Sequence, residues 1–564
     1  MILIMTDDQG YGDIGHHGNP WIKTPHLDKF ADESLELTNF HVGTTCTPTR
    51  AGLMTGRNAN RNNAWHTIAG CSILSEDEET IAEVFAKNGY QTAMFGKWHL
   101  GDNYPFRPHD RGFQTALYHG GGGIGQTPDH WGNDYFDDTY FRNGEPEKFE
   151  GYCTDVWFDE TIAYLKDHSK KPFFIYLAPN AAHGPFNVPE KYAKLHANDP
   201  LTHGQKRFYG MINNIDENFG KLVAWLEDNN LADNTILIFT TDNGTANGIS
   251  YLKKENKTLG YNAGLRGVKG SNYDGGHRVP FFIRWPEGGF VQKPSLNELV
   301  SHVDILPTLA AMTGLPYKPG ASLDGTNVTG MLNGEIPSLD RMLVVDTQRK
   351  QWPEKGRNSC VMTTQWRLVN GSELYNTLED PGQKNDLASE FPDQVSKMNE
   401  FYTTWWSDIA SEAEYAYIPI GQDPVSLTIH DLHTEELLPW NQQQIREAKH
   451  NPNGYYTIDI LEEGNYQFRM SRYPPESGLA INEEAKKIDP SPSRDGLPTG
   501  IGIEATTAII KLNDETISIA DIDPGQPYVV IEKELGKGQY KFSSTFLTAD
   551  NTQYSVYYNI IEKL

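Results

Sequence analysis

The sequence predicts an α/β fold with a mostly parallel central sheet flanked by helices, a small α+β subdomain and a C-terminal β-sandwich-like domain. Short, continuous apolar runs recur in the first half of the chain, and such runs suit strands that are buried on both faces. Segments with helical periodicity separate these runs, which is typical of a parallel sheet. Beyond about residue 415 the chain instead shows short strand-like segments and turns, spaced as in a β-sandwich.

Four apolar runs share one layout, with a charged or polar group following each run. They occupy residues 2–5, 92–95, 173–177 and 236–239. Helical patterns lie between them at residues 24–31, 80–86, 156–165 and 212–226. Because ligands bind outside the carboxyl ends of the strands in such sheets, we expect the active site at this edge.

The chain changes character after about residue 345. Strands are predicted at residues 366–369 and 373–376, followed by a helix over about 392–409. Further strands are predicted at residues 455–460, 466–470, 508–510, 528–531 and 555–558. The expected organisation is a catalytic α/β domain over 1–344, an α+β subdomain over 345–414 and an all-β accessory domain over 415–564.

The chain is acidic, with 48 Lys and Arg residues against 75 Asp and Glu residues, a formal charge of −27. This balance argues against non-specific nucleic-acid binding. No apolar run approaches the roughly 18 residues that a membrane-spanning helix needs. Residue 1 leads directly into a buried strand, without the basic region and cleavage site of a signal peptide. We therefore expect an export signal upstream of this numbering and a periplasmic or secreted location.

The cysteines are too few for a disulfide framework in 564 residues. They are Cys46, Cys71, Cys153 and Cys360. If Cys46 serves chemistry, at most one bridge remains. We expect the other three to be buried, apolar thiols.

Two pairs of oxygen ligands follow two of the apolar runs. Asp7 and Asp8 come after the first run, and Asp242 and Asn243 come after the last. A single Asp-Asp pair is more often a turn or a helix cap. Two such pairs after matching buried strands instead indicate a site for a hard divalent cation, Ca²⁺ or Mg²⁺.

Further polar groups follow the other runs. Lys97 and His99 are two residues apart after the second run, and strand alternation would place both on one face. His183 lies in a loop after the third run, and Lys269 lies between glycines that allow close approach to a ligand. Taken singly, each is equally well explained by a solvated or structural loop. The four glycines at 120–123 lack the strand–helix context of a dinucleotide-binding loop, so we reject that interpretation.

The segment over residues 46–50 reads Cys-Thr-Pro-Thr-Arg and continues to Gly-Arg at 56–57. It resembles the signature of the formylglycine-dependent sulfatases, in particular the bacterial arylsulfatase-type members of the alkaline-phosphatase-like superfamily. In this family the motif Cys-x-Pro-Ser/Thr-Arg directs oxidation of the cysteine to an aldehyde residue. The other candidate residues occur in the family order, and the resemblance covers nearly the whole chain. Asp274 and His277 depart from the family, in which Glu and a small or apolar residue are common at these places.

This resemblance implies a sulfuric ester hydrolase. A formylglycine-generating maturation system would convert Cys46 to formylglycine (3-oxoalanine). The hydrated aldehyde would attack sulfur, expel the alcohol, and then eject sulfate as the aldehyde forms again. The divalent cation would be held by Asp7, Asp8, Asp242, Asn243 and the modified Cys46.

The resemblance also assigns the cationic and imidazole groups. Lys97 and Lys269 would contact the sulfate, and Arg50 would contact the hydrated aldehyde. His183 would protonate the leaving oxygen, and His99 would take the proton from the second hydroxyl. Because charge is screened beyond about 10 Å at moderate salt, this cationic pocket can bind an anion inside an acidic shell.

A sulfated carbohydrate, either an oligosaccharide or a polysaccharide, is the preferred substrate class, as in bacterial polysaccharide degradation. Trp65, His66, Trp131 and the segment over 118–140 offer stacking surface, although such side chains also pack in cores. The acidic exterior disfavours engulfing a long polyanion, so we expect exo action at chain ends. Two alternatives remain: a phosphate or phosphonate ester hydrolase of the same superfamily, and a carbohydrate-binding protein in which Cys46 is never converted.

Overall fold

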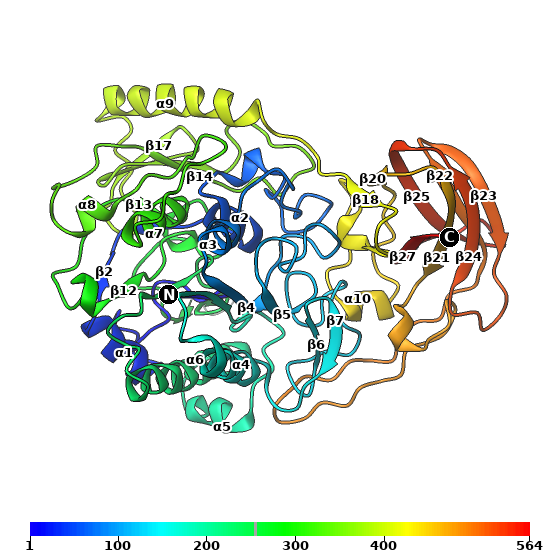
Figure 1. Ribbon diagram of the computed structural model, residues 1–564, viewed down its shortest axis with the longest axis horizontal. Helices are drawn as coiled ribbons and strands as arrows, with labels where there is room; N and C mark the ends of the chain where they lie inside the picture. Colours follow the sequence, from blue (N-terminus) through cyan, green and yellow to red (C-terminus); the bar gives the residue numbers. More distant parts are fainter. Residues whose placement is uncertain (253–256) are drawn as a thin grey trace.

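The central sheet is built around five parallel strands, as shown by the computed structural model, which describes residues 1–252 and 257–564 (Figure 1). In order they are β9 (Leu237–Thr241), β1 (Ile2–Thr6), β8 (Phe173–Ala178), β4 (Gln91–Lys97) and β5 (Thr115–His119). Antiparallel strands extend both edges: β12 (Phe282–Arg284) and β2 (Leu35–Glu36) beyond β9, and β6 (Thr139–Arg142) and β7 (Glu145–Lys148) beyond β5. The predicted α/β class with a mostly parallel sheet is confirmed.

Helices cover both faces of this sheet, and the side chains of β1 show why. Leu3 belongs to a core shared with α2 (Cys46–Thr55), α3 (Ile81–Lys87) and α7 (Ile305–Met312). Ile2 and Ile4 belong to a second core, shared with α1 (Pro25–Asp32), α4 (Cys153–His168) and α6 (His203–Asp228). Successive residues of a strand point to opposite faces, so a strand covered on both sides consists mainly of apolar residues.

Helix α6 begins well before residue 212, where the apolar periodicity predicts its start. Thr202 and Gln205 form a capping box, in which the Thr202 hydroxyl accepts from the Gln205 N–H and the Gln205 side chain accepts from the Thr202 N–H. The first turn of α6 is mostly polar, so the hydrophobic pattern does not register it.

A four-stranded antiparallel sheet follows the catalytic region. Its strands are β14 (Leu343–Asp346), β15 (Ser359–Met362), β16 (Trp366–Val369) and β17 (Glu373–Asn376). Helix α9 (Pro392–Ala410) packs on it, with Met398, Tyr402 and Trp406 in a shared apolar cluster. The two strands and the helix predicted here are confirmed.

The C-terminal region consists of two sheets around one apolar core (yellow to red in Figure 1). The first contains β18 (Ile418–Ile420), β20 (Tyr456–Ile460), β25 (Gly538–Thr548), β22 (Ala505–Leu512), β23 (Glu515–Asp521) and β26 (Gln553–Ser555). The second contains β19 (Val425–Thr428), β27 (Tyr558–Lys563), β21 (Gly464–Ser471) and β24 (Val529–Leu535). This is the sandwich-like arrangement that the sequence predicts.

The strand predicted at residues 555–558 is wrong. Ser555 ends β26 in one sheet, and Tyr558 begins β27 in the other. Val556 and Tyr557 carry the chain between the sheets and are buried, so they form an apolar run without being part of a ladder. Burial between two sheets and burial within one strand produce the same local pattern.

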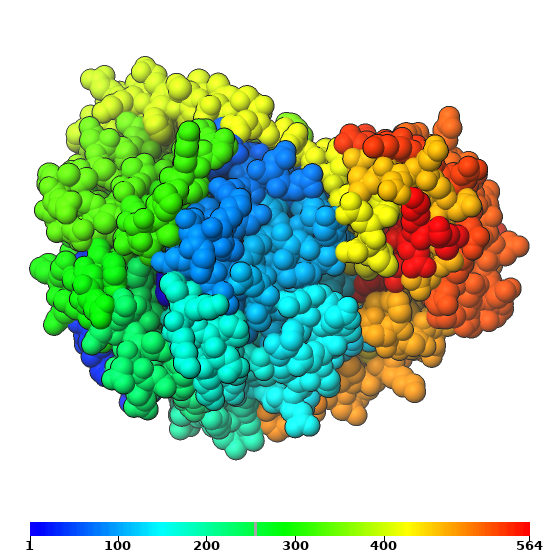
Figure 2. Space-filling model, viewed as in Figure 1, coloured from blue at the N-terminus to red at the C-terminus, as the bar shows by residue number. Residues whose placement is uncertain are grey.

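Several short elements lie outside these layers. They are α5 (Glu190–Ala193), α8 (Thr329–Leu332), α10 (Gln442–Arg446), the pair β3 (Phe40–His41) and β13 (Val300–Ser301), and the pair β10 (Ile249–Leu252) and β11 (Lys257–Gly260). Figure 2 shows the C-terminal region packed beside the blue and cyan residues of the first part of the chain. Among the described residues, no helix combines the length and apolar content needed to cross a membrane.

Candidate active site

The two pairs of oxygen ligands meet because the strands that precede them are parallel neighbours. Thr6 of β1 is in register with Thr241 of β9, so Asp7–Asp8 and Asp242–Asn243 emerge side by side. The Asp8 N–H donates to Asp242 Oδ1 at 3.2 Å, and Asn243 Nδ2 donates to Asp8 Oδ1 at 2.8 Å. All four side chains are buried.

Cys46 is the first residue of α2, and the N-terminus of this helix faces the carboxylates. Its Sγ lies 3.6 Å from Asp7 Oδ1 and 3.5 Å from Lys269 Nζ. The Thr49 hydroxyl donates to the Asp242 carbonyl at 2.6 Å and so ties the first turn of α2 to the end of β9. Burial raises the pKa of the Cys46 thiol to about 12. The unmodified thiol is therefore protonated at neutral pH and is a poor nucleophile.

Each buried carboxylate faces a cation. Lys97 Nζ lies 2.7 Å from Asp7 Oδ2, and Lys269 Nζ lies 2.6 Å from Asp8 Oδ1. Both lysines therefore lie at the strand ends. Lys97 is the last residue of β4, and Lys269 comes from the glycine-flanked loop.

Arg50 is the cation that pairs with the third carboxylate, Asp242. Its Nε and Nη2 donate to Asp242 Oδ2 at 3.1 and 2.8 Å, and its Nη1 donates to the Lys97 carbonyl and the Tyr176 hydroxyl. The side chain is fully buried. The structure therefore shows Arg50 bound to Asp242 and to β4, which makes it a residue that positions the strand ends.

The donor set fits a hard divalent cation. Ligand atoms of Asp7, Asp8, Cys46 and Asp242 all lie within 4.8 Å of one another. Asn243 Oδ1 is buried without a hydrogen-bond partner among the described residues. Burial, with Asp242 next in effect, raises the pKa of Asp7 to about 8. A bound cation would offset this penalty, and carboxylate and amide oxygens are the ligands that Ca²⁺ and Mg²⁺ prefer.

The two histidines approach from different loops. His183 Nδ1 donates to the Gly184 carbonyl at 2.7 Å, and its Nε2 lies 3.9 Å from Asp8 Oδ2. A carbonyl only accepts, so Nδ1 carries the proton and Nε2 is the atom that faces the carboxylates. Burial, followed by the charge of Lys269, lowers the pKa of His183 to about 4.

His99 lies beyond the end of its strand. Its Nε2 bonds to the Thr67 carbonyl at 2.8 Å, which leaves Nδ1 buried without a hydrogen-bond partner among the described residues. Strand alternation does not set its position, because β4 ends at Lys97 and His99 has a φ of 61°. His99 nevertheless lies near Lys97, whose charge adds to burial in lowering the pKa of His99. Thr47 connects helix α2 to the loop that carries His99, since its hydroxyl donates to the His99 carbonyl at 3.3 Å.

Gly122 and Gly123 are functional positions that sequence reasoning missed. A Cβ on Gly122 would lie 2.3 Å from His99 Cε1, and a Cβ on Gly123 would lie 3.0 Å from His183 Nδ1. The glycine run thus makes room for both imidazoles. Four glycines outside a nucleotide-binding context are a signal for such close approach, although they do not say what approaches.

The aromatic side chains named from the sequence divide into two groups. Tyr118 and Tyr140 are buried in the apolar cores, and Trp65 is buried against Trp352 and Tyr415. Trp131 is half-buried and lines a cavity that also contains His183. His66 accepts from the N–H groups of Thr67 and Ile68 and so shapes the chain before the turn at Ala69 and Gly70.

The departures at Asp274 and His277 belong to a buried network. His277 Nδ1 lies 2.9 Å from His41 Nδ1, and Arg367 Nε donates to Asp274 Oδ1 at 2.8 Å. Arg367 Nη2 also reaches Asn39 Oδ1 and His41 Nε2. Because Arg367 lies on β16, this network joins the four-stranded sheet to the loop that carries Lys269.

Replacing Arg367 with alanine should lower the free energy of unfolding by about 3–5 kcal/mol, because Asp274 would remain buried with only the more distant Arg278, at 4.0 Å, as a cationic partner. Urea denaturation measures this difference. Lys87→Ala is the control, since Lys87 and Glu79 form a pair with 67% and 30% side-chain exposure, for which a loss of at most about 1 kcal/mol is expected. Equal losses for the two variants would contradict this account of the network.

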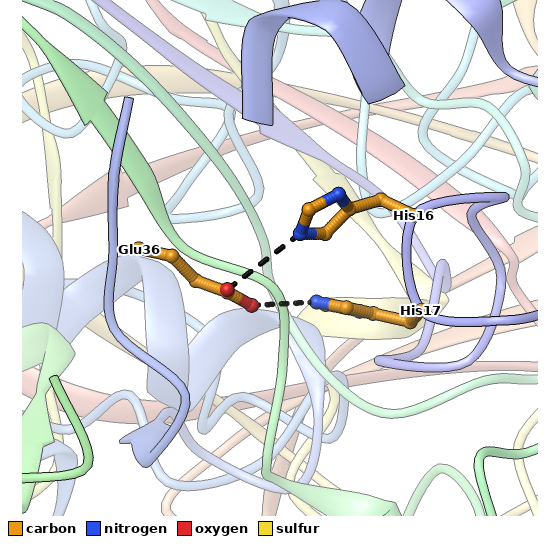
Figure 3. Close-up of side chains that lie close together, drawn as sticks. All are labelled: His16, His17 and Glu36. Atoms are coloured by element: carbon orange, nitrogen blue, oxygen red, sulfur yellow. Dashed lines mark hydrogen bonds and ion pairs between the residues drawn. The ribbon is translucent and has the colours of Figure 1, made fainter. Parts of the chain in front are cut away.

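A separate group of imidazoles and a carboxylate lies beside the edge strand β2. Figure 3 shows His16 and His17 pointing toward Glu36. His17 Nε2 lies 2.8 Å from Glu36 Oε1, and His16 Nε2 lies 3.6 Å from Oε2. Burial acts to raise the pKa of Glu36, but hydrogen bonds from His16 and His17 lower it to about 2. These contacts hold the loop after β1 against β2.

The fold, with buried carboxylates and cations at the strand ends, is the alkaline-phosphatase-like fold of sulfatases, which is also seen in solved structures. Residues 1–315 match the family model named Sulfatase, so the chain belongs to the sulfatase family and is a sulfuric ester hydrolase.

Known relatives agree with this assignment. Human arylsulfatase A is 32% identical over 372 residues, which cover 59% of this chain and 68% of the relative. Human N-acetylgalactosamine-6-sulfatase is 29% identical, over 60% of this chain and 67% of the relative. The crystal structure of Ps i-CgsB superposes with a TM-score of 0.64 at 27% identity, covering 73% of this chain and 93% of that one.

Proposed function

We propose that this sulfatase removes sulfate from a carbohydrate, using a formylglycine made from Cys46 and a divalent cation, Ca²⁺ or Mg²⁺. The observation that carries the proposal is the position of Cys46, whose Sγ lies within 3.6 Å of both Asp7 and Lys269 at a helix N-terminus. A group formed there meets carboxylates, cations and the positive end of a helix dipole together.

The cation would be held by Asp7, Asp8, Asp242, Asn243 and the modified Cys46, and it would supply Lewis-acid polarisation of the sulfate. The aldehyde supplies, when hydrated, a hydroxyl nucleophile, and its re-formation releases sulfate. Arg50 holds Asp242 in place through two hydrogen bonds. Fixed groups of this kind need no rearrangement during the reaction.

The remaining groups would act on the substrate. Lys97 and Lys269 would exchange their carboxylate contacts for contacts with the sulfate oxygens. His183 would deliver a proton from Nε2 to the leaving oxygen, which requires the imidazolium form of the side chain. His99 would accept the proton of the second hydroxyl at Nδ1, the atom left without a partner among the described residues.

A carbohydrate substrate is supported by the named relatives. One structure of Ps i-CgsB is a complex with k-i-k-neocarrahexaose. We assign catalysis to residues 1–344, with 345–414 as a supporting subdomain and 415–564 as an accessory domain. Because polymeric sulfated carbohydrates are encountered outside the cytoplasm, we place the mature protein in the periplasm or outside the cell, after a formylglycine-generating system has converted Cys46.

Two measurements test this proposal. Mass spectrometry of the peptide containing Cys46 should show a loss equal to the difference between a thiol and an aldehyde. Enzyme verified in this way should hydrolyse the sulfate ester of a phenol far faster than the phosphate ester of the same phenol. Preference for the phosphate ester would support the phosphatase alternative, and an unconverted Cys46 in fully active enzyme would overturn the formylglycine mechanism.

A further inference from the structure

A cavity of about 440 Å³ opens beside His183, the residue proposed above to protonate the leaving oxygen of the ester. Its volume is within the range of small-ligand pockets. The cavity is lined by the loops around 124–134 and 183–187, and also by residues 440–446 and 488–497 of the C-terminal region. Two segments of the C-terminal region thus line the same cavity as His183, the proposed proton donor.

The first segment, at the start of α10, is attached to the loop that follows the glycine run. Asn441 forms a β-bridge with Gln126, and the Gln442 N–H donates to the Gly125 carbonyl at 3.0 Å. Gln442 Nε2 donates to the carbonyls of Gln126, Asp129 and His130. Since Gly122 and Gly123 of the same loop contact the two imidazoles, this segment is held at a set position relative to His99 and His183.

The second segment, residues 488–497, is called the strap below. Figure 1 shows it as the orange trace that runs from the C-terminal region beneath the catalytic part. Arg494 Nη1 lies 2.7 Å from Asp134 Oδ2, and Asp495 Oδ1 lies 2.8 Å from Arg207 Nη1. The Val188 N–H donates to the Ser493 carbonyl at 2.9 Å. The strap is thereby fastened to the segments that carry the other walls of the cavity.

The lining of the cavity suits a sugar ring. Trp131 and Trp440 are half-buried and provide apolar faces. Gln126 adds an amide group to the lining, whereas the amides of Asn133 and Asn187, which also line the cavity, are bonded to Asp129, Thr139, Asp134 and Asp495 and fix its walls. A pyranose presents C–H faces that pack on aromatic rings and hydroxyl edges that bond to amides. The two acidic lining residues, Asp134 and Asp495, are already paired with arginines, so they do not repel a sulfated ligand strongly.

We propose that the C-terminal β region completes the sugar-binding pocket of this active site. Trp131 and Trp440 hold the sugar that carries the sulfate ester, and the strap forms one wall of the pocket. This assignment rests on the proposed carbohydrate sulfatase function. It gives the region over 415–564 a direct part in substrate selection.

The test compares Trp440→Ala with wild-type enzyme on two kinds of substrate. One is a small aryl sulfate, 4-nitrophenyl sulfate, and the other is a set of sulfated disaccharides derived from glycosaminoglycans and carrageenans. We expect KM for the cleaved disaccharide to rise about tenfold, as loss of one aromatic sugar contact implies, while kcat/KM for the aryl sulfate, whose smaller leaving group fills less of the cavity, falls by a clearly smaller factor. Trp440→Phe should restore most of the affinity.

Trp352→Ala is the matched control, because Trp352 is 47% exposed and packs against Trp65 outside this cavity. It should leave both substrates unaffected. Thermal unfolding checks that each variant folds, and Trp131→Ala replaces Trp440→Ala if the latter does not. Equal losses on both substrates, or an unchanged disaccharide KM, would overturn the pocket assignment. Cleavage of the aryl sulfate without cleavage of any disaccharide would overturn it as well, whereas inactivity on every sulfate ester would instead refute the proposed function.

Discussion

Replacing Cys46 with serine should stop the enzyme after one turnover, with sulfate left on the protein. The serine hydroxyl can attack sulfur among the same groups, but the resulting ester lacks the second hydroxyl whose deprotonation ejects sulfate. Intact-protein mass spectrometry should show one added sulfuryl group, and the kinetics should show a burst without steady-state turnover. Cys46→Ala should lose activity by a factor on the order of 10⁶ while still binding substrate, as when a covalent nucleophile is removed elsewhere.

Cys360→Ser is the control for these variants. Cys360 is a buried free thiol on β15 and plays no part in the proposed site, so activity should persist. Steady turnover by Cys46→Ser at the wild-type rate would rule out the formylglycine mechanism. The other free thiols, Cys71 and Cys153, are also buried, as the sequence predicts.

Replacing Asp242 with alanine should damage both activity and stability. The variant loses one cation ligand and leaves Arg50, which is fully buried, without its carboxylate. We expect kcat/KM to fall on the order of 10³-fold, because a cation contributes several kcal/mol of charge stabilisation. The free energy of unfolding should fall by about 3–5 kcal/mol, the usual result of breaking a buried ion pair.

Asn243→Ala separates these two effects. It removes a neutral ligand and leaves no buried charge unpaired, so it should weaken Ca²⁺ or Mg²⁺ binding while costing less stability than Asp242→Ala. Calorimetric cation titration measures binding independently of activity, and urea denaturation measures stability. If both variants bound the cation like wild type, these residues would not be its ligands.

Much of this site is visible in the sequence because its residues follow apolar runs. An apolar run such as Ile2–Thr6, placed between helical segments, predicts a strand that is buried on both faces. The first charged residue after the run then lies at the end of that strand. Asp7 and Asp242 are therefore predictable as neighbours once both strands are recognised. Lys97 is predictable for the same reason, and Cys46 stands out through its motif.

Other parts of the site follow no local pattern. The glycines at 122 and 123 matter because His99 and His183 pack on them. Arg50 lies within the recognised motif, yet its two hydrogen bonds to Asp242 Oδ2 join residues 192 positions apart. The strap attaches to Asp134 and Arg207 through ion pairs that span hundreds of residues. Such contacts depend on how whole layers pack, and sequence periodicity reports only which face of one element is buried.

Cys46 and the acidic pairs were thus recognisable from the amino-acid order alone, since the motif and the strand-end positions are local properties of the chain. The tertiary structure decided which cation faces which carboxylate, which nitrogen of each histidine is left to act, and that a C-terminal segment reaches the active-site cavity. The physical reason is that hydrogen bonds and ion pairs need atoms within about 3 Å, and only the packed fold sets distances on that scale.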